Sequence, residues 1–263
     1  MVSQRMITAI GLVVLGAGLI ALPPTLFKLA MGVLIILASE ELLRIQQQMR
    51  IASTIVPCSG QFSMQSQRVQ YGLWMSMGGG YVWASVGIGA NLSIVFVLII
   101  LLLMSDAQKK NIIWQRVAIS ISVVCLCQAL YGITQLHEEN IELLCTIVGL
   151  VAISDIIGYY AGGLYGKKRI FPLLSPKKTE YGTLAMIFLP GLIWVGLLGY
   201  PQDSLGFLGS CTGLFALLGD LWMSQLKRIA GMKDSGQILP GHGGLLDRID
   251  SHILCFFILT GIL

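Results

Sequence analysis

Acidic, hydroxyl and basic side chains recur at helical spacing near the end of an apolar stretch of this chain. Asp220, Ser224, Lys227 and Arg228 stand at i, i+4, i+7 and i+8, a spacing that places them along one face of a helix. A carboxylate binds Mg²⁺ together with substrate phosphates, and Lys and Arg neutralise phosphate oxygens. Polar residues at membrane depth are costly and usually face a cavity. The stripe therefore indicates a site for a phosphate-bearing substrate.

A glycine-rich segment, residues 229–250, follows this stripe and ends in a second group of charges. Its glycines can bring backbone N–H groups close to an anion, and Asp247 and Asp250 open the next helix. In-line phosphoryl-type transfer depends on positioning and charge stabilisation. A metal on Asp220 and Asp247 would meet that need, with phosphates on the cations Lys227, Arg228, Lys233 and Arg248. Taken singly, a charged helix end is usually a solvated cap, a glycine-rich loop is usually a connector, and a lone histidine is usually structural.

The segment SQLKRIAGMKDSGQILPGHGGLLDRID, residues 224–250, resembles the signature of the phosphatidate cytidylyltransferase family. All eleven fixed positions of that signature are met within these 27 residues. They are Ser224, Lys227, Arg228, Lys233, Asp234, His242, Gly243, Gly244, Asp247, Arg248 and Asp250.

Two further segments resemble the same family. GKKRIFPLLSPKKTEYG, residues 166–182, is similar to its Ser-Pro-Lys-Lys-Thr loop, with Ser175, Lys177, Lys178 and Thr179 in place. By itself this segment would be an ordinary positively charged cytoplasmic loop. SDIIGYYAGGLYGK, residues 154–167, is a weaker match, and its Asp155 lies deep in an apolar stretch.

The resemblance implies a membrane enzyme that condenses CTP with phosphatidic acid, releasing pyrophosphate and forming CDP-diacylglycerol. It places a two-metal site of Mg²⁺ or Mn²⁺ on Asp220 and Asp247. Phosphate charge would be held by Lys227, Arg228, Lys233 and Arg248, and the nucleotide by Ser175, Lys177, Lys178, Thr179 and Ser224. Asp234, His242 and Asp250 would be site residues whose roles are not separated, and Asp155 a polar site within the membrane.

Composition indicates which elements must position these residues. The chain has 263 residues, of which 55% are hydrophobic and 11% charged, against about 25% charged in a soluble domain. We therefore expect an all-α, polytopic membrane bundle with about eight or nine transmembrane helices. The expected spans are 6–22, 25–44, one or two within 69–105, 112–134, 140–162, 183–199, 204–226 and 244–263, with polar residues 45–68 as a loop or interfacial piece.

The two spans 183–199 and 204–226 return the chain to its starting side, so loops 163–182 and 224–250 should face one compartment. Both loops are basic, which predicts the cytoplasmic side of a bacterial-type inner membrane. We expect one membrane domain, 1–263, in which residues 1–139 are weakly similar to the family and residues 140–263 are catalytic. The expected partners are CTP, phosphatidic acid and membrane lipid, with no nucleic acid. A homodimer is one open alternative for the oligomeric state.

Three other functions stay open from the sequence. A CTP-dependent kinase of a lipid alcohol would use a similar architecture and release CDP. An enzyme for ether-lipid phosphates would share the same charged residues. A non-enzymatic transporter or scaffold would not need every charge of the 224–250 signature to be present.

Overall fold

The computed structural model describes residues 2–54, 112–172, 174–198, 205–238 and 243–262. The regular secondary structure of these residues is helical, with no strand; the one β-type contact among them is an isolated bridge between Arg169 and Thr179 in the loop between α6 and α7. The predicted all-α class is thereby confirmed. The helices are α1 (Val2–Ile20), α2 (Pro24–Thr54), α5 (Ile112–Glu139), α6 (Ile141–Tyr165), α7 (Glu180–Leu198), α8 (Leu205–Ile229) and α9 (Leu246–Ile262).

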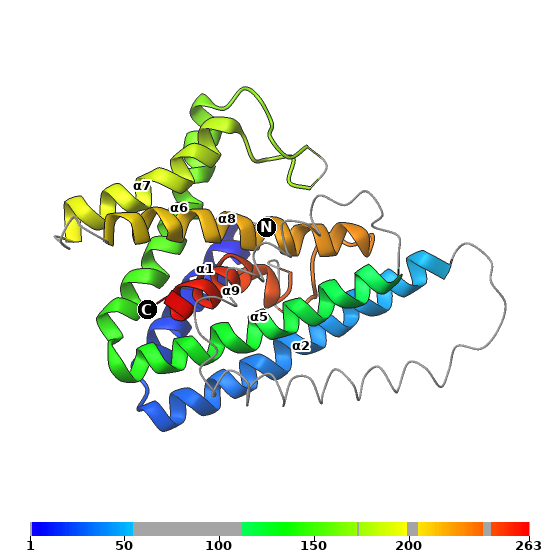
Figure 1. Ribbon diagram of the computed structural model, residues 1–263, viewed down its shortest axis with the longest axis horizontal. Coiled ribbons are helices and arrows are strands. Elements are labelled where there is room, and N and C mark those ends of the chain that lie inside the picture. The colour runs from blue at the N-terminus through cyan, green and yellow to red at the C-terminus, as the bar shows by residue number, and fades with distance from the viewer. Residues whose placement is uncertain (1, 55–111, 173, 199–204, 239–242, 263) are drawn as a thin grey trace.

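Helix α2 corrects one prediction, because residues 45–54 continue it and are not a loop or interfacial piece. Ile45 and Met49 are four residues apart, so they lie on one helix face, and both are almost fully buried. Helix α2 packs along α5, and the two long helices run side by side (Figure 1). The polar glutamines around them concealed the apolar face in the sequence. The rest of that predicted segment, 55–68, lies outside the described residues.

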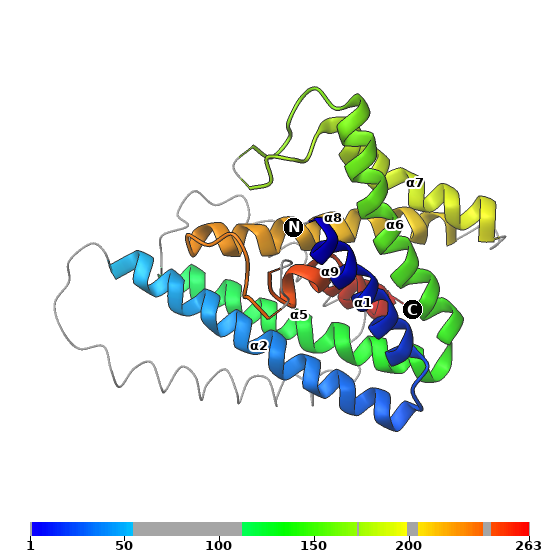
Figure 2. The ribbon, with the colours of Figure 1, turned by 180° about the vertical axis from the view of Figure 1, so that it is seen from behind.

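Helix α9 forms the centre of the fold and packs against both α5 and α8 (Figures 1 and 2). Every residue from Ile253 to Leu259 is buried. A helix that is apolar on all sides and buried is a core helix. The first turn of α9 is therefore held in place by the packing that follows it, which fixes the position of the acids Asp247 and Asp250.

Glycines allow α6 and α7 to approach closely. A Cβ atom added at Gly182 would lie 2.6 Å from the Gly158 carbonyl oxygen and 2.9 Å from the Gly162 Cα. Small residues at such contacts are typical of helix pairs in membranes. The close approach brings the loop between α6 and α7 over the α6 residues that face α8.

Within the described residues, two helical stretches are long and apolar enough to cross a membrane, Val117–Glu139 and Ile141–Tyr165. Most of the second stretch is not buried inside the protein, so its apolar side chains face outward. The predicted number of eight or nine transmembrane helices is not confirmed. The span or spans expected within 69–105 lie outside the portion of the chain that the structure describes.

Candidate functional site

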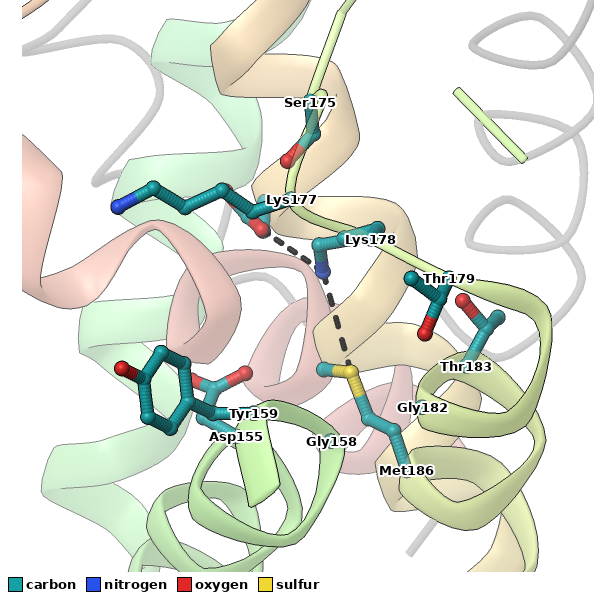
Figure 3. Close-up of a pocket in the computed structure, with 11 residues that line it drawn as sticks. Asp155, Gly158, Tyr159, Ser175, Lys177, Lys178, Thr179, Gly182, Thr183 and Met186 are labelled. Carbon is teal, nitrogen blue, oxygen red and sulfur yellow. Dashed lines mark hydrogen bonds and ion pairs between the residues drawn. The ribbon is translucent and has the colours of Figure 1, made fainter. Parts of the chain in front are cut away.

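A cavity of about 220 Å³ lies where α6, α7, α8 and the loop between α6 and α7 meet (Figure 3). Five of the residues predicted from the 154–182 region line it, together with Asp220 of α8. The structure thus brings the 163–182 loop, its two flanking helices and α8 to one place. The lining residues are Asp155, Gly158, Tyr159, Ser175, Lys177, Lys178, Thr179, Gly182, Thr183, Met186 and Asp220.

Lys178 ties the loop to α8. Its Nζ lies 2.8 Å from Asp220 Oδ2 and 3.8 Å from the sulfur of Met186 (Figure 3). The other oxygen of Asp220, Oδ1, accepts a hydrogen bond of 3.3 Å from Ser224, one turn further along α8. Asp220 therefore meets a cation on one side and a hydroxyl on the other.

Backbone hydrogen bonds give the loop its shape. The Lys178 amide donates to the Ser175 carbonyl at 3.1 Å, forming a tight turn around Pro176. The Ile170 amide donates to the Lys178 carbonyl, and the Glu180 amide donates to the Lys168 carbonyl. The two ends of the loop are thus joined side by side, which holds Lys178 over the cavity.

A second group of charges lies at the end of α8 and the start of α9. Lys227 Nζ is 2.6 Å from Asp247 Oδ1 and 3.9 Å from Asp250 Oδ2. Asp247 Oδ2 also accepts hydrogen bonds from the amides of Ser235 and Gly244, at 2.8 and 2.9 Å. Because Lys227 and Asp250 are buried, Lys227 supplies charge compensation that water does not supply there.

Asp247 lies at the N-terminal end of α9, outside the two apolar spans. Burial raises the pKa of its carboxyl, but the hydrogen bond and charge of Lys227 and the amides of Gly244 and Ser235 outweigh burial. The net pKa lies below the ordinary value of an aspartate. The structure therefore stabilises Asp247 as a carboxylate.

Electrostatics joins the two groups of charges into one site. Asp220 is close enough to Asp155 and to Asp250 to act on both electrostatically, while Lys178 acts on Asp155 and Lys227 acts on Asp250 in the opposite sense. Acids and amines therefore alternate from the cavity to the start of α9. Such an arrangement can hold phosphates and a cation close together.

Glu41 of α2 is a site residue that the sequence analysis missed. Its carboxylate is fully buried and accepts three hydrogen bonds, from Ser235 Oγ at 2.7 Å and from the amides of Leu245 and Leu246, both at 2.9 Å. The first amides of a helix have no partner within the helix, and a negative charge there also suits the helix dipole. Glu41 thus holds the glycine-rich loop and the start of α9 together. Its position as an acid in an apolar segment was the signal available.

Three glycines of the loop leave room for this contact. A Cβ atom at Gly236 would lie 2.5 Å from Glu41 Oε1, and one at Gly244 would overlap Ser235 Oγ and the carboxylate of Glu41. Gly243 has φ = +84°, a backbone conformation that glycine adopts without the strain of a side chain. The glycines of this segment therefore serve the approach of Glu41 as well as any approach of substrate.

Both predicted metal ligands, Asp220 and Asp247, have their two oxygens engaged by other groups, but only Asp220 lines the cavity. Within the described residues no three His, Cys, Asp or Glu side chains form a ready-made metal centre. Asp220 and Asp155 line the cavity, and Mg²⁺ usually takes one or two carboxylates and completes its shell with phosphates and water. These residues therefore fit a cation bound together with substrate. The oxygens of Asp247 accept hydrogen bonds from Lys227 and from the amides of Ser235 and Gly244. A cation on Asp247 would therefore have to bind through the lone pairs that these donors leave open.

Four predicted residues are exposed and stand apart from the cavity: Arg228, Lys233, Asp234 and Arg248. Arg228 turns to the carbonyl of Met232, at 3.4 Å from its Nη1. His242 lies outside the described residues. The remaining predicted positions take part in the contacts given above.

Comparison with known proteins is consistent with this arrangement of charges. The model of the Cytidylyltransferase family matches residues 3–263. The chain belongs to the cytidylyltransferase family. This confirms the resemblance found in residues 224–250.

Curated relatives cover a portion of the chain. It is 43% identical over 128 residues to the phosphatidate cytidylyltransferase of Synechocystis, covering 44% of this chain and 43% of the relative. It is 40% identical over 143 residues to the phosphatidate cytidylyltransferase of Helicobacter pylori, covering 49% of this chain and 52% of the relative. An uncharacterized protein of Escherichia coli is 41% identical to it over 116 residues, covering 42% of this chain and 39% of the relative. The matched segment spans about half the length of these relatives.

Proposed function

We propose that the protein transfers the cytidylyl group of CTP to phosphatidic acid, forming CDP-diacylglycerol and pyrophosphate. The observation that carries the proposal is the cavity in which Lys178 and Asp220 meet, beside the buried Lys227–Asp247 pair, at the end of an outward-facing apolar helix. Membership of the cytidylyltransferase family and the names of the curated relatives support it.

In the proposed reaction, an oxygen of the lipid phosphate attacks the α-phosphorus of CTP. A bond between that oxygen and the α-phosphorus forms, the bond from the α-phosphorus to the bridging oxygen breaks, and pyrophosphate leaves with the bond electrons. A phosphate monoester is largely ionised near pH 7, because its second pKa is about 6. The attacking oxygen therefore needs no general base.

The residues of the site would position phosphates and neutralise their charge. Lys178 is aimed at the cavity from the loop, and Ser175, Lys177 and Thr179 stand beside it. Lys227 would keep Asp247 and Asp250 in place while substrate binds. We further propose that the exposed Arg228, Lys233 and Arg248 contact phosphates once substrate is present, and that Asp234 and His242 act in the same loop.

A magnesium or manganese ion, when bound, would supply positive charge to the reacting phosphates. Asp220 is the residue best suited to hold it, since its carboxylate lines the cavity, and we keep Asp247 as the second proposed ligand. Asp155 lines the same cavity as Asp220 and is a further oxygen ligand within reach of a cation bound there. A titration of activity against Mg²⁺ distinguishes one bound ion from two.

The outer face of α6 supports a location at a membrane surface. Tyr159, Tyr160 and Tyr165 are all exposed at the end of α6 that reaches the loop, and tyrosines gather where membrane and water meet. A lipid headgroup could reach the cavity at this level while its acyl chains stay in the bilayer. We propose a multi-pass protein of the bacterial inner membrane with both loops on the cytoplasmic side; a homodimer stays a prediction.

The experiment combines purified protein, CTP, phosphatidic acid and Mg²⁺, and measures CDP-diacylglycerol and pyrophosphate, with Asp220→Asn and Asp247→Asn in parallel. The proposal predicts both products from the wild type and at least a hundredfold less from folded variants, because loss of one transition-state contact costs about two to three orders of magnitude. Release of CDP with phosphorylation of a lipid alcohol would replace the proposal by the kinase alternative.

A further inference from the structure

A larger groove of about 540 Å³ adjoins the cavity at the end of α6. Tyr159, Lys177 and Thr179 line both spaces, so the groove continues the cavity. Sites for molecules of nucleotide size usually measure about 300–1,000 Å³. The cavity alone falls below this range and the groove lies within it, so a nucleotide that reacts in the cavity has room to extend into the groove.

Three cations line the groove: Lys167, Arg169 and Lys177. All three are exposed, and none of them forms an ion pair with another residue of the described chain. In contrast, Lys178 and Lys227 are engaged by Asp220 and Asp247. In Figure 3 the side chain of Lys177 extends away from that of Lys178. The positive charge of the groove is therefore available to an anionic ligand.

The groove is also held in shape before any ligand binds. The bridge between Arg169 and Thr179 and the hydrogen bond from the Ile170 amide to the Lys178 carbonyl, 3.2 Å, join its two sides. Thr179 Oγ1 in turn donates to the Gly162 carbonyl of α6 at 3.4 Å. A site whose residues are already in position loses less free energy on ordering when it binds a ligand.

We propose that this groove binds the β- and γ-phosphates of the nucleotide and holds pyrophosphate before it is released. This inference rests on the proposed function. Two linked phosphates present more negative charge than the single phosphate of a lipid headgroup, which carries about 1.5 to 2 charges at pH 7, and three uncompensated cations match the larger charge. The reacting α-phosphorus would then lie toward Lys178 and Asp220, and the leaving group would already be in the groove when its bond breaks.

The test measures binding of inorganic pyrophosphate with Mg²⁺ to the detergent-purified full chain, in the wild type, Lys167→Ala and Arg169→Ala. The matched control is Lys168→Ala, which removes the same charge from an exposed position of the same loop that lines neither space. Loss of one charge-assisted contact at an exposed site should raise the dissociation constant about three- to tenfold. Lys168→Ala should change it less than twofold, and the double variant Lys167→Ala/Arg169→Ala should exceed either single variant.

Steady-state kinetics distinguishes the two sources of phosphate. The proposal predicts a higher KM for CTP and weaker inhibition by pyrophosphate, with the KM for phosphatidic acid unchanged. A raised KM for phosphatidic acid with unchanged pyrophosphate binding would assign the groove to the lipid headgroup and overturn the proposal. Absence of pyrophosphate binding by the wild type, or equal effects of the Lys168 and Lys167 variants, would also overturn it.

Failure of the proposed function would look different. A wild type that forms no CDP-diacylglycerol, yet binds pyrophosphate in a manner that depends on Lys167 and Arg169, would refute cytidylyl transfer and leave the groove assignment standing.

Discussion

Replacing Glu41 by glutamine tests the contact that joins the N-terminal helices to the catalytic loop. The carboxylate accepts hydrogen bonds from Leu245 N at Oε1 and from Ser235 Oγ and Leu246 N at Oε2. Glutamine has nearly the same shape but only one acceptor oxygen. If that oxygen occupies the Oε2 position, two bonds persist and the new NH₂ group faces the Leu245 amide.

The variant therefore loses one hydrogen bond to a charged group and leaves a donor at the start of α9 without an acceptor. The cost is about 2 kcal/mol, or a fall of roughly 5 °C in the thermal midpoint for a chain of this size. Glu41→Ala removes all three bonds, and we expect it to cost about 5 kcal/mol. Because Asp247 accepts from the Ser235 and Gly244 amides of the same loop, we also expect kcat to fall more than KM changes.

The assay is thermal unfolding in detergent followed by steady-state kinetics below the midpoint. The matched control is Glu40→Gln, since Glu40 is the adjacent acid of α2 and is exposed. It should leave both the midpoint and kcat close to the wild type. A Glu41→Gln protein that unfolds and turns over like Glu40→Gln would refute the positioning role of Glu41.

Three further perturbations follow from the same contacts. Lys227→Met leaves Asp247 and Asp250 without their buried counter-charge and should lower the free energy of unfolding by about 3–5 kcal/mol. Arg228→Met, at an exposed neighbouring position, should lower that free energy by less than a fifth as much, as measured by thermal unfolding. Gly182→Leu should separate α6 from α7 and lower both the thermal midpoint and the activity. The control is Gly196→Leu, since a Cβ atom at Gly196 meets no atom within 4 Å, and it should lower neither. Equal effects of the two variants would contradict the close contact between α6 and α7. Chelation with EDTA should abolish turnover and added Mg²⁺ restore it, with activity that persists in EDTA as the contrary result.

The 224–250 segment shows how far local spacing predicts a site. Asp220 and Ser224 are four residues apart and form the hydrogen bond expected on one helix face. Lys227 follows Asp220 by seven residues, or nearly two full turns, and points into the site. Arg228 is one residue further on, so it is rotated by about 80° from Asp220, and its side chain is exposed.

Contacts between distant segments of the chain could not be predicted in this way. Ser235 is 194 residues from Glu41, and no periodicity within either segment encodes that pairing. The continuation of α2 to Thr54 was missed for a related reason, because the burial of Ile45 and Met49 comes from tertiary packing, in which α2 lies along α5. Sequence spacing predicted which residues share a helix face, while packing decided which faces meet.

The central claim is that the α-phosphorus of CTP is transferred to a lipid phosphate, and the most direct measurement follows that atom. Purified protein is supplied with phosphatidic acid and Mg²⁺ and with CTP labelled either at the α- or at the γ-phosphorus. The account predicts label in the lipid product from α-labelled CTP and label in pyrophosphate from γ-labelled CTP. Label passing from the γ-phosphorus into a lipid, with release of CDP, would contradict it.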